Sequence, residues 1–134
     1  MGETFPITVA IVDDDASCAR SLTRLLNAFG VRSATYGTAE AFLADRERPR
    51  FDCLILDVNL GLGMSGIELA RTLAVHDRAR PPVIYLSARD DSETRASAAA
   101  TGCAAYFVKR EHGGELVEAI LKYGSRTSRQ SDRR

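Results

Sequence analysis

Five short, mostly apolar runs alternate along the chain with segments of helical periodicity. The runs occupy residues 7–12, 31–36, 51–56, 83–86 and 104–108, and the second is more polar than the others. Strands that alternate with helices form a parallel sheet covered by helices on both faces, because parallel neighbours need a crossover connection. Nearly continuous apolar strands fit burial on both faces. The sequence therefore predicts an α/β fold with one five-stranded parallel sheet, whose second strand lies near an edge.

Local signals place the ends of the helices between these runs. Leu22, Leu25, Leu26 and Phe29 recur at the spacing of one helical face, and Gly30 is predicted to end that helix. The other predicted caps are Asp15 and Thr38 as N-caps, Ser65 with Glu68 as a capping box, Asp90 with Glu93 as a second one, and Gly102 and Gly124 as helix ends.

Length and composition bound the class of protein. The chain has 134 residues, which suits one domain, and its 18 Lys and Arg balance 18 Asp and Glu, so net charge gives no argument for nucleic acid. It has no apolar stretch long enough for a membrane-spanning helix, and no signal peptide is visible. Three cysteines, Cys18, Cys53 and Cys103, lack metal-ligand spacing. An odd count without a secretory signal predicts reduced thiols in the cytoplasm.

Acidic residues follow two of the predicted strands. Asp13, Asp14 and Asp15 come directly after the first, and Asp57 comes after the third. The carboxyl ends of parallel strands share one edge, so these carboxylates should crowd together. Two unit charges about 4 Å apart repel by roughly 4 kcal/mol at an effective dielectric of about 20. A cation would relieve that repulsion, and a site with only oxygen ligands favours Mg²⁺.

The same edge receives a hydroxyl and an amine. Ser87 and Ala88 follow the fourth strand and Lys109 follows the fifth, whereas no Walker-type or dinucleotide-binding glycine motif occurs. An aspartate beside Mg²⁺ can accept a phosphoryl group, a reaction that needs mainly positioning and charge neutralisation. Simpler interpretations stay open for single residues: Asp13 and Asp14 as helix caps, Tyr106 as core packing, and Asn59 as a solvated loop residue.

Taken together, these motifs resemble the response-regulator receiver domain of two-component signalling, similar to the single-domain chemotaxis regulator. The resemblance covers roughly residues 8–124 and implies a flavodoxin-like sheet with strand order 2-1-3-4-5. It also implies that Asp57 is phosphorylated, and that Mg²⁺ is bound by Asp14, Asp57 and the backbone carbonyl of Asn59, with Asp13 acting through water. Ser87 and Lys109 would bind the phosphoryl group, and Tyr106 would be the switch aromatic.

The resemblance also implies partners. The donor would be a sensor histidine kinase or a histidine phosphotransfer protein, the downstream protein is unknown, and the chain would be a phosphoacceptor rather than a multiple-turnover enzyme. Residues 1–124 are expected to form the receiver domain, and residues 125–134 a disordered basic tail or the start of a linker. Alternatives are a phosphorylation-independent pseudo-receiver that binds proteins, a Mg²⁺-dependent phosphohydrolase, and a nucleic-acid contact by the tail.

Three positions depart from the family pattern. Arg110 follows Lys109 where proline is usual, Leu60-Gly61 stands where Met-Pro is usual, and the predicted fourth helix is rich in alanine. A cis bond before a residue other than proline costs about 2.5–4 kcal/mol. We therefore expect a differently shaped loop after Lys109, a mobile glycine-rich loop after Asp57, and an unusual surface on the fourth helix.

Overall fold

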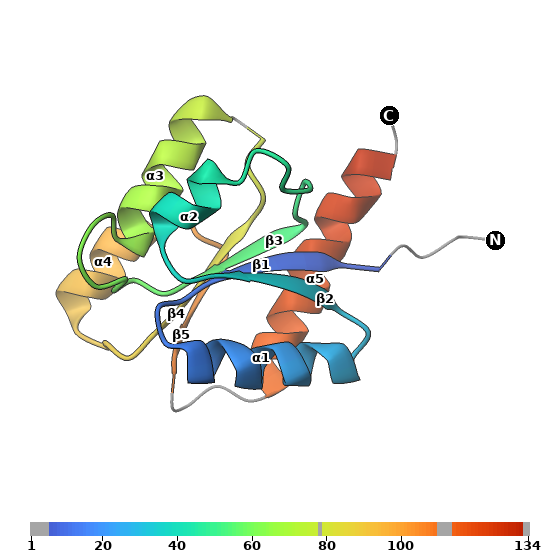
Figure 1. Ribbon diagram of the computed structural model, residues 1–134, viewed down its shortest axis with the longest axis horizontal. Coiled ribbons are helices and arrows are strands. Elements are labelled where there is room, and N and C mark those ends of the chain that lie inside the picture. The colour runs from blue at the N-terminus through green and yellow to red at the C-terminus, as the bar shows by residue number, and fades with distance from the viewer. Residues whose placement is uncertain (1–5, 78, 110–113, 133–134) are drawn as a thin grey trace.

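The computed structural model describes residues 6–77, 79–109 and 114–132, and side chains up to residue 125. Its centre is a parallel sheet with strand order β2-β1-β3-β4-β5 (Figure 1). The strands are β1 (Thr8–Val12), β2 (Arg32–Tyr36), β3 (Cys53–Leu56), β4 (Val83–Ser87) and β5 (Ala105–Val108). The predicted fold class and strand order are confirmed, and β2 is an edge strand, as its polar sequence indicates.

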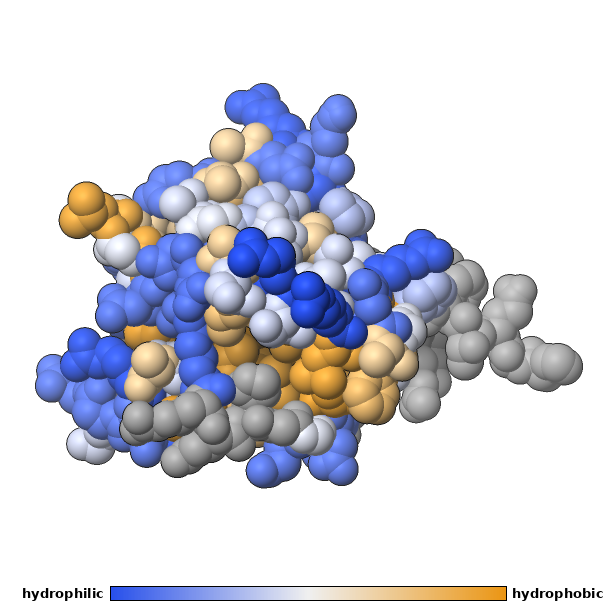
Figure 2. Space-filling view, turned by 60° about the horizontal axis from the view of Figure 1, so that its bottom comes forward, coloured by the Kyte–Doolittle hydropathy of each residue, from blue (hydrophilic) through white to orange (hydrophobic). Residues whose placement is uncertain are grey.

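Helices alternate with the strands and cover both faces of the sheet (Figure 1). They are α1 (Ala16–Ala28), α2 (Ala39–Ala44), α3 (Gly66–His76), α4 (Ser92–Ala99) and α5 (Gly114–Asp132). None of the helices in the described part of the chain is long and apolar enough to cross a membrane. Seen from the side of α1 and α5, hydrophobic residues gather in a band bordered by hydrophilic ones (Figure 2).

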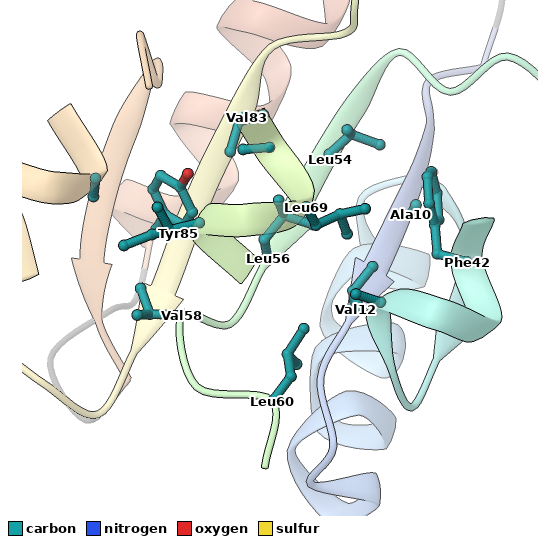
Figure 3. Packing of buried hydrophobic residues seen from close by; sticks show 14 of the residues in the cluster. Ala10, Val12, Phe42, Leu54, Leu56, Val58, Leu60, Leu69, Val83 and Tyr85 are labelled. Carbon is teal, nitrogen blue, oxygen red and sulfur yellow. The ribbon is translucent and has the colours of Figure 1, made fainter. Parts of the chain in front are cut away.

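Two hydrophobic clusters hold the helices to the sheet. In one cluster, alternate strand residues such as Val12, Leu56 and Tyr85 pack against α2, α3 and α4, with Phe42 and Leu69 at the helix contacts (Figure 3). The other cluster joins the opposite face of the same strands to α1 and α5. Successive strand residues point to opposite faces, so the mostly apolar strands β1, β3 and β4 supply both clusters.

Most of the predicted helix starts are confirmed. Asp15 caps α1, Thr38 caps α2, and the capping box of Ser65 and Glu68 opens α3. The predicted capping box of Asp90 and Glu93 is wrong. The N-cap of α4 is Asp91, and its carboxylate accepts a hydrogen bond from the backbone N–H of Thr94 at 3.0 Å. Asp90 instead forms an ion pair with Arg95 at 2.6 Å.

The sequence predicted that Gly124 ends the last helix, and this prediction is wrong. Gly124 is buried within α5, which continues to Asp132. A Cβ atom at this position would lie 2.9 Å from Cγ2 of Ile7, so the missing side chain lets α5 approach the segment before β1. The described backbone of 125–132 is helical and not irregular, although the division into a receiver domain and a tail or linker stays a prediction.

The alanine-rich helix α4 is the least buried of the helices with described side chains. Only Ala98 among its residues is buried, and neighbouring β5 is largely half-buried. Arg80 ties the end of this helix to α3, because its guanidinium donates to the carbonyl of Ala70 at 2.7 Å and also to the carbonyl of Thr101. Few apolar contacts hold α4, which makes it a segment that can move at low cost.

We predict that Gly66→Ala destabilises the fold. A Cβ atom at Gly66 would lie 2.0 Å from the backbone carbonyl oxygen of Asp57, so α3 or the end of β3 must shift. The expected loss is roughly 3 kcal/mol in the free energy of unfolding, the upper part of the range for overpacking. Urea unfolding measures it. Gly37→Ala is the control, because nothing lies within 4 Å of its added Cβ. Equal stability of the two variants would contradict this account of Gly66.

Candidate functional site

The sheet's hydrogen bonding continues past the strand ends and fixes the backbone of the site. The N–H of Asp13 donates to the carbonyl of Tyr36 at 3.0 Å, and the N–H of Asp57 donates to the carbonyl of Val12 at 3.0 Å. Between β4 and β5, the N–H of Lys109 donates to the carbonyl of Ser87 at 2.8 Å. The backbones of Asp13, Asp57 and Lys109 are therefore placed by the sheet itself, although each residue stands just beyond the end of a strand.

Three carboxylates converge at this edge. Asp13 and Asp57 are 6% and 5% exposed, whereas Asp14 is open to solvent. One oxygen from each of the three lies within 4.8 Å of the other two. The donor set consists of hard anionic oxygens with one side open to solvent, which suits a cation such as Mg²⁺ that keeps several water ligands. The residues present therefore fit the metal that the sequence predicts.

Lys109, which follows the edge strand β5, reaches the two buried carboxylates at the ends of β1 and β3. Its ammonium nitrogen lies 2.9 Å from Oδ2 of Asp57 and 3.1 Å from Oδ2 of Asp13. The lysine side chain is 20% exposed, so this ion pair is partly shielded from water. The predicted convergence of Lys109 with the acidic residues is confirmed.

The electrostatics of this cluster are unbalanced. Burial raises the pKa of Asp57, and the nearby Lys109 ammonium offsets that effect only in part. Burial alone would lower the pKa of Lys109, but its hydrogen bonds to Asp57 and Asp13 and their charges outweigh burial and raise it. The two directions have different main causes: burial at Asp57, and the two neighbouring carboxylates at Lys109. The lysine is therefore held charged, while ionised Asp57 is costly until another cation arrives.

Backbone amides orient the two buried carboxylates. Oδ1 of Asp57 accepts a hydrogen bond from the N–H of Asn59 at 3.1 Å, and Oδ1 of Asp13 accepts one from the N–H of Asp15 at 2.9 Å. The other oxygen of Asp57, Oδ2, faces Lys109. Asn59 thus touches Asp57 through its N–H, a contact that leaves its carbonyl oxygen available as a ligand.

The loop after Asp57 is held close to the site by a residue that the sequence did not single out. Gly61 and Gly63 both have positive φ values, of 73° and 99°, and a Cβ atom at Gly61 would lie 3.5 Å from Oδ2 of Asp14. The carboxylate of Glu40, in the first turn of α2, accepts a hydrogen bond from the N–H of Met64 at 2.8 Å. Glu40 thus gives this loop one contact with α2, and the expected mobility of the loop stays a prediction. No sequence signal links positions so far apart.

Ser87 and Tyr106 meet through the backbone of Arg89. Ser87 is fully buried, and its Oγ accepts a hydrogen bond from the N–H of Arg89 at 3.1 Å. The hydroxyl of Tyr106 donates to the carbonyl of the same residue at 2.7 Å. The guanidinium of Arg95 in α4 lies 4.7 Å from the centre of the Tyr106 ring. Tyr106 is half-buried and contacts the core ring of Tyr85, so core packing describes only part of its environment.

The bond between Lys109 and Arg110 includes a residue outside the described part of the chain, so its expected geometry stays a prediction.

Cys18 lies beside the acidic cluster, where burial and a hydrogen bond to Asp13 raise the pKa of its thiol to about 11. A thiol held protonated is a poor nucleophile and a poor metal ligand.

Known proteins are similar to this chain in sequence over most of its length. The transcriptional regulatory protein TdiR of Thauera aromatica is 33% identical over 113 residues, which cover 84% of this chain and 49% of TdiR. The response regulator protein TmoT of Ectopseudomonas mendocina is 33% identical over 112 residues, covering 84% of this chain and 50% of TmoT. The chain thus spans about half the length of these relatives.

Solved structures agree with this likeness. The structure of a response regulator receiver protein from Burkholderia phymatum is 35% identical with a TM-score of 0.75, and the match covers 88% of this chain and 94% of the other. A CheY-like receiver domain from Methanospirillum hungatei JF-1 has a TM-score of 0.82 at 23% identity, covering 94% and 99% of the two chains, and supports the fold alone. The family model for the response regulator receiver domain matches residues 9–121. The chain belongs to this family and is the receiver domain of a two-component response regulator.

Proposed function

We propose that this receiver accepts a phosphoryl group on Asp57 from a phosphohistidine of a sensor kinase or a histidine phosphotransfer protein. The observation that carries the proposal is the environment of Asp57: a carboxylate only 5% exposed, 2.9 Å from the Lys109 ammonium and among other acids. An oxygen of Asp57 attacks phosphorus, and the new O–P bond forms as the P–N bond of the donor breaks and its imidazole leaves.

A Mg²⁺ ion would be held by Asp14, Asp57 and the backbone carbonyl of Asn59, with Asp13 acting through a water molecule. When bound, the ion would neutralise charge on the transferred oxygens and on the acidic cluster. Lys109 already contacts the carboxylate that reacts, so it can follow the charge from the Asp57 carboxylate to the phosphoryl group. The raised pKa of Lys109 supports this assignment, because it reflects the negative charge of Asp57 and Asp13, and burial makes the ionised form of Asp57 costly without a further cation.

Phosphorylation would then change the surface around α4 and β5. A phosphoryl group adds roughly −1.5 to −2 charge and strong acceptor oxygens. Ser87 would turn its hydroxyl toward the phosphoryl group, and its contact with the N–H of Arg89 would carry that movement to the loop before α4. The hydroxyl of Tyr106 holds the carbonyl of Arg89, so the tyrosine would respond to the same movement. The sparse packing of α4 fits a segment that shifts between two states.

The partners follow from this role. The phosphoryl donor is a histidine kinase or phosphotransfer protein in the cytoplasm, and the output is a protein that distinguishes the two states. The acyl phosphate is a stored signal, so the chain acts as a phosphoacceptor and not as a multiple-turnover enzyme. A pseudo-receiver that binds proteins without phosphorylation is the alternative, and the intact acidic cluster with Lys109 is an observation against it.

We predict that incubation with acetyl phosphate and Mg²⁺ adds one phosphoryl group to the wild-type chain. The attacking oxygen is a carboxylate of Asp57, so Asp57→Asn should gain none. Intact-protein mass spectrometry measures the gain. Asp15→Asn is the matched control, because Asp15 is the neighbouring N-cap and asparagine caps helices equally well. Absence of modification in the wild type would favour the pseudo-receiver, and modification that persists in Asp57→Asn would contradict Asp57 as the phosphorylated residue.

We predict that Mg²⁺ stabilises the folded chain through the acidic cluster. At a concentration about five times its Kd, a ligand specific for the folded state adds about 1 kcal/mol, a shift of several degrees in Tm. Asp14→Asn should lose most of this shift, because a neutral amide oxygen replaces an anionic ligand, while Asp15→Asn keeps it. Thermal unfolding with and without Mg²⁺ measures the difference. If Asp14→Asn and the wild type shift alike, Asp14 is not a ligand.

We predict that Asp57→Asn stabilises the metal-free chain at neutral pH. The pKa of Asp57 is raised in the folded state, so its ionisation at neutral pH favours unfolding. The expected gain is on the order of 1 kcal/mol, the usual size of the effect of one substitution, because Lys109 keeps Asp13 as its ion-pair partner. The gain should shrink as pH falls through the folded-state pKa toward the unfolded-state value, because Asp57 then becomes neutral as well. Urea unfolding at about pH 7 and about pH 5 tests the sign; a gain that grows on acidification would contradict it.

A further inference from the structure

A cavity lies at the end of the sheet that is away from Asp57. It has a volume of about 510 Å³ and lies between α2, α3 and the loops that lead into β3 and β4. Phe51 and Pro81, which precede these strands, are part of its lining, whereas Asp57 follows the far end of β3. The four residues of β3 separate the two sites by roughly 13 Å. The cavity is therefore distinct from the acidic cluster, and its volume suits a small organic ligand.

The floor of this cavity is apolar and partly aromatic. Leu73 of α3 and Pro81 line it with half-buried side chains, and the lining residues Phe42, Phe51 and Leu54 are almost fully buried. The rings of Phe42 and Phe51 lie 6.0 Å apart, centre to centre. Such a floor favours a flat apolar group, because contact with it removes apolar surface from water.

The rim of the cavity is strongly basic. Arg46, Arg48, Arg50 and Arg80 line it with a single acidic side chain, Asp77. Four guanidinium groups around one opening repel one another unless an anion joins them. This charge contrasts with the zero net charge of the whole chain. An anionic group at the rim would be electrostatically favoured.

Two of these arginines already have structural roles. Nη1 of Arg48 donates to the carbonyls of Phe42, Leu43 and Asp45, which closes the end of α2, and the guanidinium lies 4.6 Å from the centre of the Phe42 ring. Arg80 ties α3 to the residues after α4. Their positions are explained by the fold, so they shape the rim but do not by themselves indicate a ligand.

The other two arginines are freer. Arg46 is exposed and makes no hydrogen bond or ion pair with any residue that the structure describes. Arg50 bonds the carbonyl of Ala79 and reaches Asp77 at a long 3.5 Å, with its side chain 52% exposed. These two guanidinium groups retain donors for a carboxylate or phosphate oxygen, which arginine binds through a planar fork.

We propose that this cavity binds a small aromatic anion. Its ring would pack on the apolar floor at Leu73 and Pro81, and its anionic group would accept hydrogen bonds from Arg46 and Arg50. The apolar floor alone would accept any hydrophobic molecule, and the arginines alone would accept any anion. Their adjacency in one cavity selects a ligand that carries both groups.

Titration with naphthoate, followed by amide NMR spectra, tests this site in the full chain. Shifts should concentrate at residues 42–54 and 73–81, with a Kd on the order of 1 mM or tighter, as ligand efficiency allows for a molecule of this size. Naphthylmethanol carries the ring without the charge, and acetate carries the charge without the ring. Each should bind at least about tenfold more weakly than naphthoate, because each lacks one of the two sets of contacts.

Removal of the rim charges should weaken naphthoate binding selectively. The double variant Arg46→Gln with Arg50→Gln should raise the Kd roughly fivefold to tenfold, and Arg46→Gln alone, which breaks no contact within the described residues, by about threefold. Arg32→Gln, an exposed arginine outside the cavity, is the control and should leave the Kd unchanged. Phosphorylation of Asp57 should persist in all of these variants, so the two proposals fail independently.

The proposal is overturned if naphthylmethanol binds as tightly as naphthoate, because the rim would then contribute nothing. It is equally overturned if Arg46→Gln binds naphthoate like the wild type, or if the shifts spread over the surface instead of gathering around the cavity. Equal naphthoate affinity in the double variant and in Arg32→Gln would also contradict the proposal.

Discussion

The shared use of the Lys109 ammonium by Asp13 and Asp57 is the interaction on which the site depends. The lysine lies within 3.1 Å of an oxygen of each carboxylate, and these groups come from the ends of β5, β1 and β3. Removing the lysine would leave two buried charges without a partner, a costly arrangement. Three carboxylates around one ammonium also leave the cluster with excess negative charge. This excess favours binding of a metal ion and of a phosphoryl group that arrives with its metal.

The sheet brings Lys109 to Asp13 and Asp57, although these residues lie far apart in the sequence. Backbone hydrogen bonds continue one residue past the ends of β1 and β3, so Asp13 and Asp57 are fixed by the ladder while their carboxylates stand at its edge. Gly66 completes the arrangement, because a side chain there would collide with the carbonyl of Asp57. The stability of the core and the geometry of the site are thus supplied by the same strands.

The fold and the main site residues could be predicted from sequence because strand ends in a parallel sheet meet at one edge. Apolar runs therefore placed Asp57 near Asp13, Asp14 and Lys109 from positions far apart in the chain. Contacts set by tertiary distance were beyond such reasoning. The choice of Asp91 over Asp90 as a cap, the passage of α5 through Gly124, the tether from Glu40 and the cluster of arginines below α2 have no periodic signal.

We propose that Asp57 itself forms the acyl phosphate. Borohydride reduction of the phosphorylated chain, followed by peptide mass spectrometry, tests this claim most directly, because the reagent converts an aspartyl phosphate to homoserine and leaves free carboxylates intact. We expect homoserine at position 57 and at no other aspartate. Homoserine at position 13 or 14, or none in a chain that has gained a phosphoryl group, would contradict the claim.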